Sequence, residues 1–581
     1  MRYYPMLPSQ RSSREMIDAF GGYDHNLRIG EGEFYDMKNM TGDRYPVLSS
    51  RAARGVYATP SDPAGLIEKD SLCYVDGSDF VANGYRVDMG LSTAAEDRPK
   101  KLLSMGAYVI IMPDRKYINT MDITEHGSID ASFTTTEDTT FELCTADGDA
   151  YEGATVSADE PSAPDNMALW IDTSSVPHTL KKYSASSSAW VPIATTYIRI
   201  SSPGIGKSFA ANDGVKISGI VSENLQALNA YAVIWGRTDD SIIVVGMLDA
   251  VTMQLISEGA ITVERKMPLV DHLTECGNRL WGCRYGVNHD GEVVNEIYAS
   301  KLGDFKNWNC FMGISTDSYA ASCGTDGQFT GAITHLGYPL FFKEDCVHKV
   351  YGSYPASFAI QQTACRGVQK GCDRSLAIVN EVLYYKSRHA VCAYDGSLPT
   401  EISAALGDAH YGDAVAGAYG NKYYISMRDG DGERSLFVFD TARGLWHKED
   451  ELAAEAFCSC RGRLYCISGG AILDLTGGGD ERVPWMVESG EIGISSPDQK
   501  YVSRLTVRMM LGVGAHASFY VKYDFDEIWE PLFELDGTSL RSFSIPVRPR
   551  RCDHLKLRVE GEGDVRIYSI TKTVTKGSEL S

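Results

Sequence analysis

The chain has no long hydrophobic run. Its longest apolar stretches, such as 107–112 and 241–248, have the length of a strand, whereas a membrane-spanning helix needs about eighteen apolar residues. Residues 1–11 have no apolar core of a signal peptide. We therefore expect a protein without a membrane span, made in a cytoplasm and leaving it, if at all, by a route other than secretion.

Positive charge is also scarce. The 581 residues contain 55 Lys and Arg against 77 Asp and Glu, which gives a formal net charge of −22 at pH 7. A surface of this sign repels nucleic acids and anionic membranes, because their phosphate groups carry the same charge. The composition therefore disfavours sequence-independent DNA binding.

Cysteine is too dilute for a disulfide scaffold, with 14 in 581 residues. Many cysteines lie inside apolar segments, among them Cys283, Cys310, Cys392 and Cys466, where we expect them to be reduced core residues. No Cys-x-x-Cys pair occurs, so the sequence does not support a zinc site.

Motifs of catalysis and cofactor binding are missing or incomplete. Residues 201–208 resemble a phosphate-binding loop, but Ser201 replaces the first Gly and no helical pattern follows. Residues 429–434 resemble a calcium loop, but Arg434 replaces the required Gly, so we expect a hairpin tip. There is no His-Glu-x-x-His pair and no Gly-x-Ser-x-Gly elbow. The sequence thus predicts no catalytic, cofactor-binding or metal-binding residues.

What the chain does contain is a repeated phrase of a turn residue followed by two or three large apolar residues. Repeats spaced by roughly 40 to 50 residues, all strand and turn, are typical of a β-propeller. Five copies, spaced by about 40 to 60 residues, are centred on Leu280, Leu340, Leu383, Tyr423 and Leu464, and two more on Leu72 and Tyr108. We therefore predict an all-β protein with about seven propeller blades; a β-sandwich with accidental spacing is the alternative.

The spacing also predicts the domains. Between Tyr108 and Leu280 the interval is far longer than one blade, which indicates an inserted β-rich domain. After Pro484 the strands become longer and alternate apolar with polar residues, as half-buried antiparallel strands do. The predicted parts are an extended N-terminal arm at 1–60, first blades at 61–122, the insertion at 123–263, remaining blades at 264–482 and a C-terminal β-sandwich at 483–581.

The arm carries the most distinctive order of residues in the chain. Its glycines permit turns or close backbone approach, so we expect the arm to be pinned to a surface. The segments are Phe20-Gly-Gly-Tyr-Asp-His-Asn-Leu-Arg-Ile-Gly-Glu-Gly-Glu-Phe-Tyr-Asp-Met-Lys-Asn-Met and Tyr45-Pro-Val-Leu-Ser-Ser-Arg. This order resembles the opening of tailed-bacteriophage tail proteins of the nozzle or tail-hub type, in which such an arm precedes a propeller.

The resemblance implies a structural virion protein that is not an enzyme. Proteins of that family form a ring, in that family a hexamer, below the portal and adaptor, and the ring continues the channel for genome ejection. The implied partners are other copies of the chain, portal or adaptor proteins, and tail fibre or tail-tip proteins. The implied location is the virion tail, assembled in the host bacterial cytoplasm, with DNA passing without specific binding and no cofactor needed.

Two other function classes stay open. A propeller can be a glycoside hydrolase or lyase, since any two carboxylates could meet at its axis. The insertion could instead be a glycan-binding module that uses Trp170 and Trp190, which we expect to be exposed or half-exposed. If the chain is a DNA conduit, its bore should be acidic; the runs 429–433 and 448–452 are the candidate bore loops.

Overall fold

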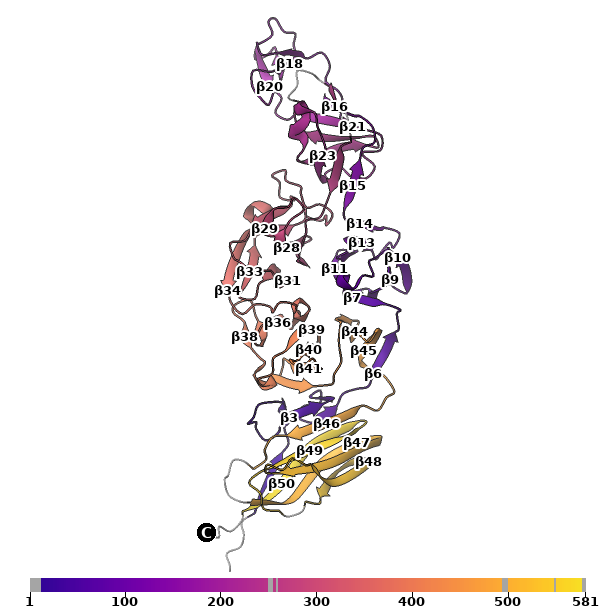
Figure 1. The fold of residues 1–581 in the computed structure, drawn as a ribbon, viewed down its shortest axis with the longest axis vertical. Coiled ribbons are helices and arrows are strands. Elements are labelled where there is room, and N and C mark those ends of the chain that lie inside the picture. The colour runs from indigo at the N-terminus through magenta and orange to yellow at the C-terminus, as the bar shows by residue number, and fades with distance from the viewer. Residues whose placement is uncertain (1–11, 249–253, 258–259, 494–499, 548–549, 577–581) are drawn as a thin grey trace, which may run out of the picture. The chain divides into compact units, whose positions relative to one another are not determined.

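The computed structural model describes residues 12–248, 254–257, 260–493, 500–547 and 550–576 and shows an all-β protein (Figure 1). The predicted class, a β-propeller with an inserted β-rich domain and a C-terminal β-sandwich, is confirmed. In these ranges the helical segments are five short 3-10 turns: η1 (Ala95–Asp97), η2 (Glu223–Leu228), η3 (Pro355–Ser357), η4 (Asp373–Ser375) and η5 (Ala404–Leu406).

Seven four-stranded sheets form the blades. Blades 1 to 3 are β7 (Pro63–Lys69), β8 (Ser71–Asp76), β9 (Asp79–Ala82) and β10 (Tyr85–Asp88); β11 (Lys101–Met105), β12 (Tyr108–Met112), β13 (Lys116–Asn119) and β14 (His126–Ser128); and β27 (His272–Glu275), β28 (Leu280–Val287), β29 (Val293–Ala299) and β30 (Tyr319–Ser322). Blades 4 and 5 are β31 (Gly331–His335), β32 (Tyr338–Phe342), β33 (Cys346–Tyr351) and β34 (Ala359–Ala364); and β35 (Ala377–Val379), β36 (Val382–Lys386), β37 (Val391–Tyr394) and β38 (Thr400–Glu401).

Blade 6 is β39 (Gly412–Tyr419), β40 (Lys422–Arg428), β41 (Arg434–Asp440) and β42 (Leu445–Lys448). Blade 7 combines β43 (Ala456–Cys460), β44 (Arg463–Ser468) and β45 (Ala471–Gly478) with β6 (Arg54–Ala58). Because β6 precedes blade 1 in the sequence, the last blade is completed by a strand from the N-terminal side of the chain.

Every copy of the repeated phrase falls on the second strand of a blade, from β8 through β44. These strands are buried on both faces, as the run Leu383, Tyr384, Tyr385 in β36 illustrates. A strand covered on both faces must be apolar at consecutive positions, which explains why this strand carries the repeat.

The chain forms two compact units. The first contains residues 1–102, 342–347 and 363–581, and in it blade 6 packs on blade 7 and blade 7 on blade 1. The second contains residues 103–341 and 348–362, and in it blade 2 packs on blade 3 and blade 3 on blade 4. Aromatic residues fill these blade contacts, for example Trp281 with Phe358 at a ring distance of 4.9 Å.

The insertion belongs to the second unit and has its own core of eighteen buried apolar residues. It contains an eight-stranded sheet, in the order β15 (Ala131–Thr134), β26 (Thr262–Arg265), β22 (Gly214–Ser218), β23 (Tyr231–Thr238), β24 (Ser241–Val245), β21 (Tyr197–Ser201), β16 (Thr139–Cys144), β25 (Gln254–Ser257). A second sheet is formed by β17 (Thr155–Ser157), β18 (Leu169–Asp172), β19 (Thr179–Ser184) and β20 (Ala189–Pro192).

The insertion starts later and ends later than the predicted range 123–263. Strand β14 at 126–128 is the outer strand of blade 2, and β15 pairs with β26 so that Ala131 lies opposite Arg265. The described part of the insertion therefore begins and ends on two adjacent antiparallel strands. The three residues of β14 show no apolar alternation that could have revealed a strand.

The N-terminal arm is not a strand-poor extension. Five of its strands join the C-terminal strands in one ten-stranded sheet, in which β47 links β49 to β50. The arm strands are β1 (Ser12–Ile17), β2 (Gly22–Tyr23), β3 (Glu33–Lys38), β4 (Met40–Thr41) and β5 (Leu48–Ser50); the C-terminal strands are β46 (Pro484–Ser489), β47 (Lys500–Tyr523), β48 (Glu530–Ile545), β49 (Leu555–Glu562) and β50 (Val565–Lys576). The surface that holds residues 12–50 is thus supplied by the same chain.

All fourteen cysteines are free thiols, and ten of them are buried. Burial raises the pKa of the Cys466 thiol to about 12, and thiols are poor nucleophiles when they stay protonated. The buried cysteines behave as small core residues, as the sequence predicts.

Candidate functional site

The arm motif, residues 20–34, connects the propeller to the C-terminal sheet. Strand β2 packs on β42 of blade 6, while β3 pairs with β46. The backbone N–H of His25 donates to the carbonyl of Ala405 at 2.8 Å, which adds a contact to the segment between blades 5 and 6. The residues that carry the resemblance therefore lie where two domains of the first unit meet.

Two glycines of the motif let the backbones approach closely. Gly22 has φ +81°, and a Cβ placed there would lie 2.4 Å from the carbonyl oxygen of Trp446. Gly32 has φ +104°, and its Cβ would lie 2.9 Å from the carbonyl oxygen of Ala19. Both contacts are shorter than any side chain tolerates, and positive φ favours glycine as well. The glycines are required by contact, as the sequence predicts.

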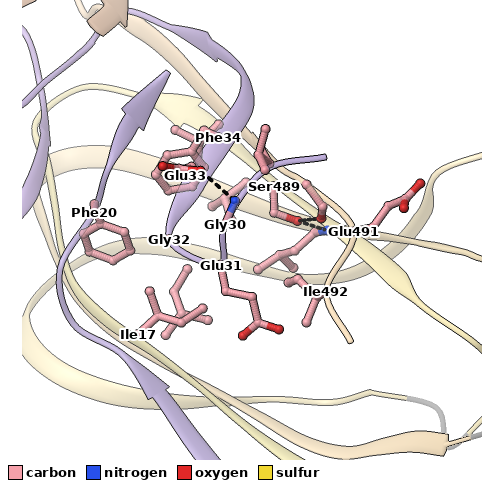
Figure 2. Close-up of a pocket in the computed structure, with 16 residues that line it drawn as sticks. Ile17, Phe20, Gly30, Glu31, Gly32, Glu33, Phe34, Ser489, Glu491 and Ile492 are labelled. Atoms are coloured by element: carbon pink, nitrogen blue, oxygen red, sulfur yellow. Dashed lines mark hydrogen bonds between the residues drawn. The ribbon is translucent and has the colours of Figure 1, made fainter. Parts of the chain in front are cut away.

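Polar contacts fold the arm motif back on itself. The N–H of Gly21 donates to the carbonyl of Gly32 at 2.8 Å. The N–H of Gly30 donates to Oε2 of Glu33 at 2.6 Å, a contact that Figure 2 marks with a dashed line. The chain turns at residues 30–33, so that β2 and β3 pair in parallel, and Glu31 lies in that turn.

A buried lysine of the C-terminal sheet pins this turn. Lys572 on β50 is 3% exposed, and its ammonium group pairs with Glu31 and, at 3.0 Å, with Glu15 on β1. The hydrogen bond from Lys572 lowers the pKa of Glu15 below its ordinary value. A buried ammonium group needs such partners because its desolvation is costly.

A second ion cluster, the arginine clamp, ties the end of the arm, including the first residue of strand β6 in blade 7, to blade 6. It consists of Arg51, Arg54, Glu449 and Asp450, whose side chains are at most 16% exposed. Arg54 contacts Glu449 at 2.8 Å and Asp450 at 2.7 Å, and Arg51 contacts Asp450 at 3.1 Å. Burial alone would raise the pKa of Asp450, but Arg54 and Arg51 bring it below its usual value.

Behind the arm motif lies a small apolar cavity, shown in Figure 2 with Ile17, Phe20 and Ile492 around it. The space that a water-sized sphere can enter is about 20 Å³, roughly that of one water molecule. Binding sites for small molecules are more than ten times larger. The cavity is therefore a packing feature of the arm and not a ligand site.

The buried carboxylates are all engaged, which bears on the hydrolase alternative. Among the described residues, those under 9% exposed are Asp76, Asp172, Asp213, Asp317, Asp440, Glu449 and Asp474. Six of the seven pair with Arg or Lys, and the seventh accepts three backbone N–H groups at 2.5, 2.6 and 3.1 Å. Lys181 lowers the pKa of Asp172 to about 2. Paired carboxylates of this kind hold turns and strands together.

A glycoside hydrolase needs one carboxylic acid with a raised pKa that faces a second carboxylate across the substrate. Burial raises the pKa of Glu488 on β46. Its neighbour across the strand pair is Asp36. Each of the two carboxylates has a cation of its own, Arg558 at 3.7 Å and Lys448 at 3.3 Å. The charge of each carboxylate is therefore balanced by its own cation, unlike the acid and base pair of a glycoside hydrolase.

The two tryptophans proposed for glycan binding pack against each other. Trp170 is 4% exposed, so the expectation that it is exposed or half-exposed is wrong, whereas Trp190 is half-buried. Their rings lie 5.4 Å apart, edge to face, and Trp190 also contacts Tyr183. Trp170 is covered by the ring of Trp190 and by Lys181, whose ammonium group lies 4.5 Å from the centre of the Trp170 ring, while the next residue, Ile171, belongs to the core of the insertion.

The two candidate acidic loops differ in structure. The run 429–433 is the exposed tip between β40 and β41, where Asp429 accepts the N–H groups of Asp431 and Glu433 at 3.0 and 2.9 Å, so the predicted hairpin tip is confirmed. In the run 448–452, however, Glu449 and Asp450 belong to the arginine clamp. That run does not present two free carboxylates to solvent, because the arm covers it.

The described parts of the chain contain no phosphate-binding loop followed by a helix, no metal-binding cluster and no membrane-spanning helix. Residues 201–208 continue from β21 into turns and not into a helix. Within the described ranges no group of three or more His, Cys, Asp or Glu could hold a metal ion. No described helix is long and apolar enough to cross a membrane.

The sequence indicated the arm motif but not that Lys572, Arg51 and Arg54 hold the arm in place through ion pairs. Their partners lie hundreds of residues away in the sequence. The spacing of the two arginines, three residues apart with Arg54 at the start of β6, is the one local signal.

Comparison with known proteins adds little. No protein-family model and no curated protein matches the chain. The exo-β-1,3-galactanase of Phanerochaete chrysosporium is 8% identical, with 52% of this chain and 95% of that chain covered and a TM-score of 0.21. A glycoside hydrolase family 43 arabinoxylan arabinofuranohydrolase from Bacillus subtilis is 9% identical, with coverages of 53% and 95% and a TM-score of 0.18. Likeness at this level carries no argument about activity.

A solved structure of another class of enzyme gives a similar TM-score. The acylaminoacyl peptidase of Pyrococcus horikoshii is 11% identical, with 53% of this chain and 55% of that chain covered and a TM-score of 0.23. Because a peptidase and glycosidases match equally weakly, the site itself must carry any proposal.

Proposed function

We propose that the chain is a structural subunit of a bacteriophage tail, which assembles into a ring of the nozzle or hub type and continues the channel for genome ejection. The observation that carries this proposal is the arm motif. Its resemblance to tail proteins falls on residues that fasten the C-terminal sheet to blade 6 through Gly22, Lys572 and the arginine clamp. A subunit that bears load between neighbours needs rigidly joined domains.

The inner surface of such a ring should not bind DNA. Each contact of Lys or Arg with a phosphate adds affinity through counterion release, which would slow the passage of DNA. The net charge of −22 per subunit and the exposed acidic tip at 429–433 support an acidic lumen. Partners of the ring would be portal or adaptor proteins on one side and tail fibre or tail-tip proteins on the other.

The hydrolase alternative has less support. Among the described residues every carboxylate that is buried has a cation or backbone N–H groups as partners, and substrate hydrolysis needs carboxylates that are not neutralised in this way.

Electron microscopy of the purified full-length chain tests the proposal. We expect closed rings with a central channel, hexameric as the resemblance implies, and no retention of double-stranded DNA in a gel-shift assay at physiological salt. Particles without a channel, or rings that retain DNA through their lumen, would contradict the proposed conduit.

A further inference from the structure

The second unit contains a polar cleft at the base of the insertion. Its volume is about 300 Å³, which reaches the size of small-molecule binding sites. One wall comes from β22, β23 and β26 of the insertion. The other comes from blade 3, through β29 and the loop that precedes it.

An ion pair joins the two walls at one end of the cleft. Lys216 on β22 pairs with Asp290 of the blade 3 loop, and the hydroxyl of Tyr231 on β23 donates to the other carboxylate oxygen of Asp290 at 3.2 Å. Tyr231 is 50% exposed, and the ammonium group of Lys216 lies 5.4 Å from the centre of its ring, so the part of the ring that Lys216 does not cover is open to a ligand. Lys216 and Asp290 are themselves 38% and 35% exposed.

Further polar groups line the cleft. Lys266 contacts Glu264 at 2.7 Å, and the hydroxyl of Tyr298 donates to Glu296 at 2.6 Å. Asn288 and Asn309 add amide groups. The lining therefore offers hydrogen-bond donors and acceptors side by side, as a ligand with many hydroxyl groups requires.

The charges of the residues that line the cleft narrow the chemical class of its ligand. The lining contains two lysines against three carboxylates, so it is nearly balanced and does not favour a phosphate or a polyanion. Pro268 and Leu269 contribute an apolar strip. Together with a partly exposed tyrosine ring, such a strip suits the C–H faces of a sugar ring.

We propose that this cleft binds a neutral oligosaccharide through Tyr231, Asp290 and the carboxylates of Glu264 and Glu296. This inference does not depend on ring assembly, because both walls of the cleft belong to one chain. It also places saccharide binding away from Trp170 and Trp190, which pack against each other.

The same groups favour binding without hydrolysis. Each carboxylate of the cleft already contacts a lysine or a tyrosine hydroxyl. The hydrogen bond from Lys216 lowers the pKa of Asp290, so this carboxyl group stays ionised and is unsuited to act as a general acid.

Saturation-transfer-difference NMR on the full-length chain tests the inference. The probes are neutral mono-, di- and trisaccharides of glucose, galactose, mannose and N-acetylglucosamine at millimolar concentration, with N-acetylneuraminic acid as the charged comparison. We expect at least one neutral probe to bind. Tyr231→Ala and Asp290→Asn should each weaken that binding about tenfold or more, because each removes a contact of the proposed site.

Tyr85→Ala is the matched control, because Tyr85 is an exposed tyrosine of blade 1, 65% exposed and outside the cleft. It should leave binding unchanged, and thermal unfolding should verify that all variants fold. The inference is overturned if no neutral probe binds, or if binding survives both cleft variants. Particle mass measured on the same variants keeps the two proposals apart, since loss of saccharide binding should not change assembly.

Discussion

The arm and the insertion are connected to the rest of the protein in opposite ways. The arm adds its strands to both sides of the C-terminal strands, with β1 and β5 on β50 and β3 on β46. The insertion starts and ends on the adjacent pair β15 and β26 and encloses its own core. The arm is thus part of another domain's sheet, whereas the insertion is a module.

The ion pairs at the two attachments show the same contrast. The arginine clamp joins residues about 400 positions apart, from the arm and from blade 6. At the insertion, Arg265 pairs with Asp213 at 2.5 Å, and both residues lie within the inserted segment. Asn307 of blade 3 donates to the same aspartate at 2.9 Å. Loss of the clamp should therefore affect the whole first unit, and loss of the insertion should not.

The largest effect is expected for Arg54→Ala in the arm. The change leaves Glu449 and Asp450 buried with Arg51 as their nearest cation. Removal of one partner from a buried ion cluster costs about 3–5 kcal/mol, because a charge is left without compensation. Denaturant unfolding of the full-length chain measures the change. Arg366→Ala is the control, since its pair with Glu401 is 59% and 43% exposed and should contribute little; equal effects would contradict the clamp.

Acid should weaken the same region through His447. Burial, with Lys422 nearby, lowers the pKa of His447 to about 4 in the folded chain, against 6.5 for an ordinary histidine. Between these values the unfolded chain binds a proton that the folded chain does not. Stability should therefore fall as pH decreases from 6.5 to 4, by at most about 3 kcal/mol from this group. The charged groups that act on its ring are Lys422, Asp440, Asp43 and Arg443.

The variant His447→Gln isolates that contribution from the titration of carboxylates. Unfolding free energies of wild type and variant, measured from pH 7 to pH 4, should show a steeper loss for the wild type. Parallel curves would mean that His447 is not kept neutral by burial.

A smaller effect is expected where the arm motif touches blade 6. Gly22 and Gly84 share φ +81°, but a Cβ at Gly22 meets the carbonyl of Trp446 and a Cβ at Gly84 meets nothing within 4 Å. Gly22→Ala should therefore destabilise by about 1–3 kcal/mol more than Gly84→Ala, since only the first adds a steric clash. Thermal or denaturant unfolding of both variants checks this. Equal losses would show that the arm does not press on β42.

The smallest effect on the rest of the chain is expected for excision of the insertion. Removing residues 131–265 removes Arg265 together with its partner Asp213 and joins Asp130 to Lys266. The two ends of the removed segment, Ala131 and Arg265, already lie opposite each other in the folded chain. The shortened chain should stay soluble and unfold cooperatively near the wild-type midpoint. Circular dichroism during denaturation measures this, and a chain that no longer folds would show that the insertion is not a module.

The propeller was predictable because its second strands are buried on both faces, so Leu383 and Tyr384 stand out as an apolar repeat. The arm strands could not be predicted in this way, because β1 pairs with residues 570–575 at the other end of the chain. Trp170 shows a further limit: its ring is covered by Lys181 of β19 and Trp190 of β20, and the sequence of a single short strand does not reveal such partners. The glycines of the arm motif indicated close contact but not the partner.

The central claim is that this chain builds a ring, and the mass of the native particle tests it most directly. Native mass spectrometry at micromolar concentration should find a closed assembly of the 63.7 kDa chain, six subunits if the resemblance holds. A monomer as the sole species under these conditions would contradict the account, because a single subunit encloses no channel for DNA.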